Sequence, residues 1–159
     1  MSIAEGTVAA RASRRMAVSP ERVFDAWLEP ERIRSWMAAA LKSAGLAGDV
    51  RRVEVDARPG GRFVFSDMRD EGEAIHWGSY LEMERPHRLV FTWFTSEEEE
   101  TQNLSTVTLT LEADGEGCVA TIVHEMSAEW SDYVEQTEGG WGRMLAQIEA
   151  LSESWKARS

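Results

Sequence analysis

The feature that most constrains the fold is a long segment, residues 49–126, in which apolar residues recur at every second position. The pattern is clearest where Val107, Leu109 and Leu111 alternate with threonines. Such alternation is typical of strands with one buried face. Short turn sequences, such as residues 114–117, separate the runs. Strands joined by turns this short must be antiparallel, because parallel neighbours need a long crossover.

The hydrophobic period changes near the C-terminus. Trp141, Leu145, Ile148, Leu151 and Trp155 follow one another at steps of three or four residues, which predicts one long amphipathic helix. An antiparallel sheet with one apolar face needs a cover on that face, and this helix is the obvious cover. Because a helix is only about 10–12 Å wide, a strongly curved sheet around it can leave space between them. The same pattern also suits a solid core.

A strand and two short helices are predicted before this segment. Residues 8–18 alternate as a half-buried strand. Ser19, Pro20 and Glu21 then favour a helix start, since serine caps free N–H groups, proline fits the first helical position and glutamate faces the positive end of the helix dipole. Pro30 ends this helix and allows a second one to begin.

The remaining segments are expected to be connections. Residues 38–48, rich in alanine and glycine, indicate a loose linker, and the glutamates at 97–100 indicate a solvated loop. The element order is therefore strand, two short helices, six strands and a long helix. We expect an α+β fold, with residues 1–159 forming one domain.

Composition excludes several classes of partner. With 17 basic and 28 acidic residues, the net charge of −11 repels nucleic acid and anionic membranes. The single cysteine, Cys118, allows no disulfide within the chain and fits a reducing compartment. The N-terminus lacks the pattern of a signal peptide, and no apolar run is long enough to span a bilayer. We expect a cytoplasmic protein without membrane insertion.

Motifs for catalysis, metals and cofactors are lacking in the sequence. Three histidines and one cysteine do not stand at metal-ligand spacing, and no phosphate loop or G-x-S-x-G serine motif occurs. We therefore expect no metal and no cofactor. Acid–base chemistry needs a titratable group with a shifted pKa inside a pocket, and His124, His76 and Asp67 are the candidates. None has a partner visible from spacing, which favours a non-enzymatic role.

Four motifs resemble one known family. They are SPERVFDAWLEPERIRSW (residues 19–36), DARPGGRFVF (56–65), ERPHRLVFTW (84–93) and EGGWGRMLAQIEAL (138–151). Their order and coverage of nearly the whole chain identify it as a member of the SRPBCC (START-like) superfamily, similar to homologues of the heat-shock-protein-90 ATPase activator. The resemblance implies a helix-grip fold, in which a seven-stranded curved sheet wraps around the C-terminal helix and encloses an apolar tunnel.

The resemblance also implies a range of functions. Members of the superfamily bind lipids, polyketides, hormones and similar small molecules, and a minority are cyclases or hydrolases. The eukaryotic ATPase activators carry an additional N-terminal domain that engages the chaperone. Since this chain begins directly with its first strand, we expect that domain to be absent, which puts a chaperone interaction in doubt.

Large side chains on the expected inner surface are the candidate ligand contacts. They are Trp36, Phe63, Phe65, Trp77, Phe91, Trp93, His124, Trp141 and Leu145. Each can equally be a core residue, and His124 can be a buried histidine with a structural hydrogen bond rather than a handle for a ligand. In the fourth strand, His76 and Trp77 have opposite parity, and we expect Trp77 to face inward. The pair Gly139–Gly140 suggests close backbone approach beside Trp141.

Three functions are compatible with these observations. The first is a non-catalytic carrier or sensor that binds an apolar small molecule, and this is the function we predict. The second is a cyclase- or hydrolase-type enzyme acting on a polyketide-like substrate. The third is a chaperone-linked or stress-response interaction module, which requires a sizeable exposed apolar patch. The sequence does not specify the ligand or the oligomeric state.

Overall fold

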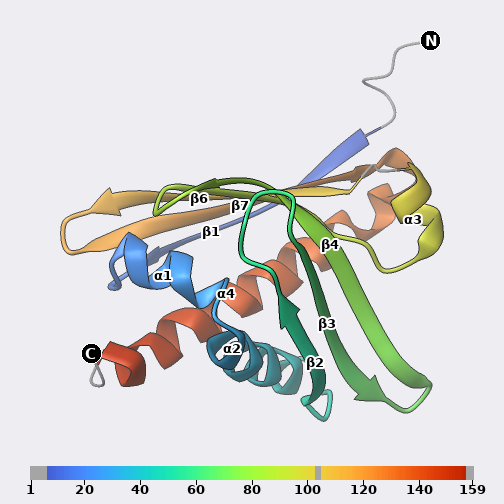
Figure 1. The fold of residues 1–159 in the computed structure, drawn as a ribbon, viewed down its shortest axis with the longest axis horizontal. Helices are drawn as coiled ribbons and strands as arrows, with labels where there is room; N and C mark the ends of the chain where they lie inside the picture. Colours follow the sequence, from blue (N-terminus) through green and yellow to red (C-terminus); the bar gives the residue numbers. More distant parts are fainter. Residues whose placement is uncertain (1–6, 103–104, 157–159) are drawn as a thin grey trace.

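The computed structural model describes residues 7–102 and 105–156, and the last described element is a long helix that follows seven strands (Figure 1). The elements in order are β1 (Thr7–Met16), α1 (Pro20–Ala26), α2 (Pro30–Ser43), β2 (Asp49–Val55), β3 (Arg62–Arg69), β4 (Gly72–Glu84), β5 (Arg88–Thr92), α3 (Glu97–Gln102), β6 (Thr106–Asp114), β7 (Gly117–Ser127), the 3₁₀ helix η2 (Ala128–Tyr133) and α4 (Val134–Lys156).

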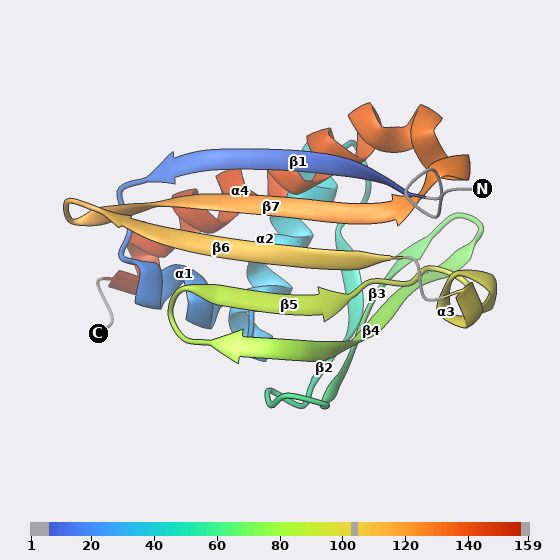
Figure 2. The same cartoon turned by 90° about the horizontal axis from the view of Figure 1, so that it is seen from above.

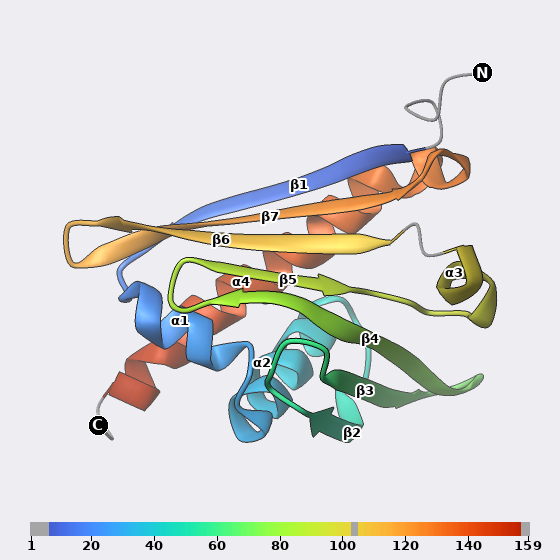
Figure 3. The same ribbon diagram turned by 45° about the horizontal axis from the view of Figure 1, so that its top comes forward.

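The seven strands form one antiparallel sheet in the order β1-β7-β6-β5-β4-β3-β2. Sequential strands from β2 to β7 are neighbours, and short turns join all of them except β5 and β6, whose connection contains α3. Strand β1 completes the sheet by pairing with β7. Figure 2 shows β1, β7, β6 and β5 side by side, and Figure 3 shows the sheet turning at β4 toward β3 and β2. The predicted α+β helix-grip fold with a curved antiparallel sheet is confirmed.

The change of direction in the sheet coincides with irregular pairing of β4. The register between β4 and β5 shifts between Tyr80 and Glu82. At Gly78 an added Cβ atom would lie 2.0 Å from the carbonyl oxygen of Thr92. Only glycine fits there, because any side chain would force the two strands apart. The bend brings β3 and the first half of β4 toward α4.

Helix α4 crosses the concave face of the sheet (Figure 1). Its apolar stripe is buried as predicted: Trp141 is 3% exposed, and Leu145 and Ile148 are fully buried. The side chain of Trp155, the last member of the predicted stripe, lies outside the described residues. Beside this stripe, the Glu149 carboxylate accepts hydrogen bonds from Arg14 Nε at 2.8 Å and from the Ala17 backbone N–H at 2.9 Å. These bonds fix α4 against the end of β1.

Two predicted connections are wrong in part. Residues 38–43, expected to be a loose linker, continue helix α2 to Ser43, because alanine is the strongest helix former. The expected loop at residues 97–100 lies in helix α3. The backbone N–H of Glu99 donates to Ser96 Oγ at 3.2 Å, so a serine cap and an acidic first turn stabilise this helix. Among the described helices, none is long and apolar enough to cross a membrane.

Candidate functional site

Two cavities lie next to each other between α4 and the concave face of the sheet. The first, which we call the β7 cavity, has a volume of about 270 Å³. The second, the α2 cavity, has a volume of about 200 Å³. Both are lined by His76, Trp93, Gly140 and Met144, a set that we call the shared wall. The two cavities are therefore neighbours with this wall in common.

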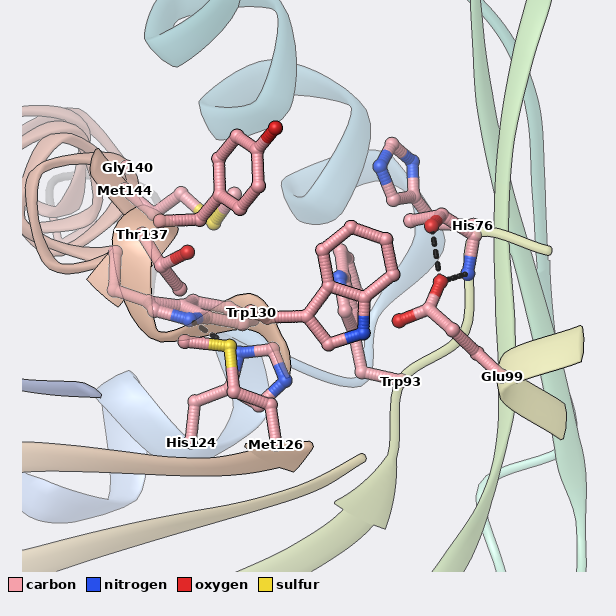
Figure 4. A pocket seen from close by; sticks show the side chains of 12 residues that line it. His76, Trp93, Glu99, His124, Met126, Trp130, Thr137, Gly140 and Met144 are labelled. Atoms are coloured by element: carbon pink, nitrogen blue, oxygen red, sulfur yellow. Dashed lines mark hydrogen bonds between the residues drawn. The ribbon is translucent and has the colours of Figure 1, made fainter. Parts of the chain in front are cut away.

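The β7 cavity lies under the end of β7 and the start of α4 (Figure 4). His124 and Met126 of β7 line one side, and Trp130 and Tyr133 of η2 line another. Trp130 is 36% and Tyr133 is 50% exposed, and their ring centroids are 5.7 Å apart. These two aromatic rings form the mouth of the cavity.

Glu99 supplies the carboxylate of the β7 cavity. Its Oε1 atom accepts a hydrogen bond from the backbone N–H of Thr95 at 3.0 Å and another from the Thr95 hydroxyl. Figure 4 shows both bonds. These bonds hold the Glu99 side chain against the residues just before α3, so the carboxylate helps to cap the N-terminus of this helix.

The α2 cavity is mostly apolar. Trp36, Met37 and Leu41 of α2 face Phe65 of β3 across it. The indole N–H of Trp36 donates to a backbone carbonyl oxygen, that of Ala26, at 2.8 Å. Trp36 therefore presents only carbon to the cavity, since its one polar atom is satisfied elsewhere.

Charged groups stand at one side of the α2 cavity. The Asp67 carboxylate, 1% exposed, accepts two hydrogen bonds from Arg69, at 2.9 Å from Nε and at 3.2 Å from Nη2. Both carboxylate oxygens are engaged by one guanidinium, which stabilises the charge of this buried acid. Arg143 of α4 lines the same cavity and is exposed.

His124 is held by hydrogen bonds on both ring nitrogens. The Trp141 indole N–H donates to His124 Nδ1 at 3.1 Å, and His124 Nε2 lies 2.8 Å from Ser105 Oγ. An indole nitrogen can only donate, so Nδ1 carries no proton and the neutral ring donates from Nε2 to Ser105. Burial lowers the pKa of His124 from 6.5 to about 4. His124 therefore orients Trp141 in the cavity wall and has no free nitrogen.

His76 is in a different position. Its ring stacks on Trp93, with centroids 4.9 Å apart and planes inclined by 28°. Its Nδ1 atom is buried without a hydrogen-bond partner. Burial and the nearby Arg69 guanidinium lower the pKa of His76 to about 4, so the ring is neutral at pH 7.

Five predicted site residues line a cavity. Trp36 and Phe65 line the α2 cavity, His124 and Trp141 line the β7 cavity, and Trp93 lines both. Their contact with a ligand stays a prediction.

The other four predicted residues lie elsewhere. Phe63, Phe91 and Leu145 are 1%, 3% and 0% exposed within the core and line neither of the two cavities. The expectation that Trp77 faces inward is wrong, because its neighbours His76 and Gly78 take the inner face of β4 and alternate side chains point to opposite faces. Trp77 instead pairs with Phe94, at a ring-centroid distance of 6.5 Å.

Several cavity residues are missed by the sequence analysis. Trp130 and Tyr133 belong to a 3₁₀ helix too short to show a hydrophobic period. Met126 and Met144 had a signal, because each continues the apolar pattern of its strand or helix. Within residues 7–102 and 105–156, no group of three or more histidine, cysteine, aspartate or glutamate side chains lies close enough to hold a metal ion.

Comparison with solved structures supports the fold. A protein of Chromobacterium violaceum is 25% identical, with a TM-score of 0.73 over 90% of this chain and 95% of the other. A Staphylococcus aureus protein of unknown function is 13% identical, with a TM-score of 0.78 and coverage of 95% and 96%. An AHSA1-like protein from Aeromonas hydrophila is 22% identical, with a TM-score of 0.71 and coverage of 94% of each chain. No curated protein matches the sequence.

A family model gives the relationship directly. The model described as "Activator of Hsp90 ATPase homolog 1-like protein" matches residues 17–153. This stretch runs from the end of β1 through most of α4 and includes both cavities. The chain therefore belongs to the Activator of Hsp90 ATPase homolog 1-like family of the SRPBCC superfamily.

Proposed function

We propose that this protein binds an apolar small molecule across the β7 and α2 cavities and acts as a non-catalytic carrier or sensor. The family typically binds hydrophobic ligands. The observation that carries the proposal is the pair of adjoining cavities, of about 270 and 200 Å³, with a shared wall. Together they fall within the roughly 300–1,000 Å³ of small-molecule pockets, whose linings are mainly apolar and aromatic.

Gly140 supports this proposal, because a glycine in the interior of a helix costs roughly 1 kcal/mol relative to alanine. A close backbone contact would justify that cost, and close approach was the expectation for Gly139–Gly140. That expectation is wrong, since an added Cβ atom at either glycine would meet no atom within 4 Å. Gly140 is part of the shared wall, whereas Gly139 lines neither cavity. The missing side chain at Gly140 keeps the junction of the cavities open.

The polar groups favour binding over catalysis. Of the three acid–base candidates, His124 has hydrogen bonds on both nitrogens and Asp67 is paired with Arg69. A general base needs a free lone pair within hydrogen-bond reach of the proton that it removes. Asp67 is 1% exposed and held by Arg69, and His76 has an unpartnered nitrogen but no carboxylate hydrogen-bonded to it among the described residues.

The exposed apolar side chains favour a small ligand over a protein partner. The large ones among the described residues are Leu46, Leu81, Trp130 and Tyr133. Three of these line a cavity, Leu46 in the α2 cavity and the other two in the β7 cavity. Leu81 alone lies away from both, which is too little for an interaction patch of several hundred Å².

Binding is tested with a panel of apolar compounds, with 2-methylnaphthalene as the reference. In ¹H–¹⁵N NMR spectra we expect the indole N–H signals of Trp93, Trp130 and Trp141 to shift on titration. The signal of Trp77, which faces away from the cavities, is the internal control. Binding also raises the melting temperature, since a ligand at a hundredfold excess over its Kd adds roughly 2.7 kcal/mol of stability. Shifts confined to Trp77, or none with any compound, contradict the proposal.

Replacing Gly140 by leucine is expected to weaken this binding at least about tenfold, because the side chain enters the junction that the ligand occupies. Gly139→Leu is the matched control, since both changes remove a glycine from the same helix and only one alters the cavities. Both variants should unfold at a higher temperature than the wild type through helix propensity. Equal affinity in the two variants would show that the ligand does not lie at the junction.

A further inference from the structure

The shared wall contains one buried side-chain atom that lacks a hydrogen-bond partner, Nδ1 of His76. Among the buried side-chain nitrogen and oxygen atoms of the described residues, three lack a partner: Trp27 Nε1, His76 Nδ1 and Tyr80 Oη. Of these residues, His76 alone lines the β7 and α2 cavities. Buried polar groups nearly always have a hydrogen-bond partner, so an exception calls for an explanation.

Four other polar side chains around the cavities have partners within the protein. The Trp36 and Trp141 indole N–H groups donate to Ala26 and His124, respectively. Glu99 accepts from Thr95, and Asp67 accepts from Arg69. The strands place His76 opposite Phe65 and beside the apolar Trp93, neither of which can accept a hydrogen bond in the plane of the ring. Neither neighbour therefore supplies a hydrogen-bond partner for His76 at the point where the two cavities meet.

The stacking of His76 decides how a ligand can approach it. Trp93 covers one face of the imidazole, and the N–H bond and the nitrogen lone pair both lie in the plane of the ring, at its edge. Figure 4 shows this ring on the side of the cavity opposite Gly140 and Met144. Nδ1 is shielded from solvent, so the nitrogen that a ligand group can reach edge-on from within the cavities is Nε2.

We propose that His76 hydrogen-bonds a neutral hydroxyl group on the ligand, so that the ligand is a hydroxylated aromatic compound rather than a pure hydrocarbon. This inference rests on the proposed function. A neutral imidazole carries one donor and one acceptor, and a hydroxyl group can satisfy either. A carboxylate suits the position less well, because the uncharged ring supplies no positive charge and Glu99 lines the β7 cavity. In the α2 cavity Arg69 is already paired with Asp67, and Arg143 is exposed, so that water screens its charge. The apolar walls on both sides would hold the body of the ligand.

The test compares 2-naphthol with 2-methylnaphthalene, which differ by a hydroxyl in place of a methyl group. His76→Phe keeps a ring beside Trp93 and removes both nitrogens. We expect it to lower the affinity for 2-naphthol roughly 3- to 10-fold, the effect of one hydrogen bond, and to leave the affinity for 2-methylnaphthalene unchanged. The matched control is His87→Phe in the exposed turn between β4 and β5, which should change neither affinity.

A measurement on the wild-type protein makes the test independent of the variant's folding. Addition of 2-naphthol should shift the ring ¹⁵N resonances of His76, and addition of 2-methylnaphthalene should shift them much less. Three results would each overturn the inference and leave the proposed function standing. They are an equal loss of affinity for both ligands in His76→Phe, unchanged ring ¹⁵N resonances of His76 on addition of 2-naphthol, and tighter binding of 2-naphthoate than of 2-naphthol. If neither naphthalene binds the wild type while another compound of the panel does, the inference alone fails; if no compound binds, the proposed function fails with it.

Discussion

Replacing Phe63 by alanine is expected to destabilise the protein by about 3–5 kcal/mol. Phe63 is 1% exposed, and its ring lies 4.9 Å from that of Phe65 and 5.7 Å from that of Phe91, between centroids. The truncation leaves a void among rings that cannot move to fill it, which adds a cavity cost to the lost burial. Urea unfolding followed by circular dichroism measures the change.

Met144→Ala is the comparison for Phe63→Ala. Met144 lines both cavities and is only half-buried, so truncating its side chain removes fewer packing contacts than truncating Phe63. We expect a loss of about 1–2 kcal/mol for this variant. Equal decreases in the free energy of unfolding for the two variants would mean that the space beside Met144 is filled. The distinction between core and cavity wall would then fail.

Acid is expected to destabilise the protein through His124. The pKa of this residue is lowered from 6.5 to about 4 by burial, so between these two values the unfolded chain binds a proton that the folded protein excludes. Stability is then highest above pH 6.5 and falls as the pH decreases toward 4, by up to about 3 kcal/mol for this group. Urea unfolding at about pH 7 and about pH 5 measures the slope.

His124→Asn isolates this contribution. An asparagine oxygen can still accept the hydrogen bond of Trp141 but does not titrate, so the loss of stability between about pH 7 and about pH 5 should be smaller than in the wild type. His87→Asn, at an exposed position, should retain the wild-type slope. A slope that is the same in all three proteins would show that His124 does not resist protonation.

Hydrophobic alternation predicts the sheet but does not distinguish the core from the cavity wall. Phe63 and Phe65 stand two residues apart and face the same way, and their sequence signals are identical. Phe63 meets Phe91 and Tyr80 across the sheet, whereas Phe65 lies where the α2 cavity begins. The difference depends on which side chains face each ring, and that is set by the curvature of the sheet and not by local sequence.

The inner face of β4 shows a second limit of the sequence. His76 and Trp77 differ in parity, and the larger apolar residue is the natural choice for the inner face. The strand places the histidine inside, because Tyr80, two positions beyond Gly78, is buried against Phe63 and Phe91. The register of the whole strand therefore places His76 on the inner face, although Trp77 is the more hydrophobic of the two residues.

The mouth of the β7 cavity has no counterpart in the sequence signals. Trp130 and Tyr133 lie in η2, and the carboxylate that faces the cavity comes from α3. Both are short elements between longer ones, with caps by Ser127 and Ser96 as their main local determinants. A capping serine predicts that a helix starts, but it does not predict which cavity the helix will border.

The two cavities differ in the sign of the charge at their far ends. Glu99 borders the β7 cavity, whereas Arg143 borders the α2 cavity, where the charges of Arg69 and Asp67 offset each other. An elongated molecule that occupies both cavities would therefore have one end in a negative and the other in a positive potential. Its two possible directions of insertion would then be unequal in energy, and under the proposed function the site would select ligands by their internal dipole as well as by their shape.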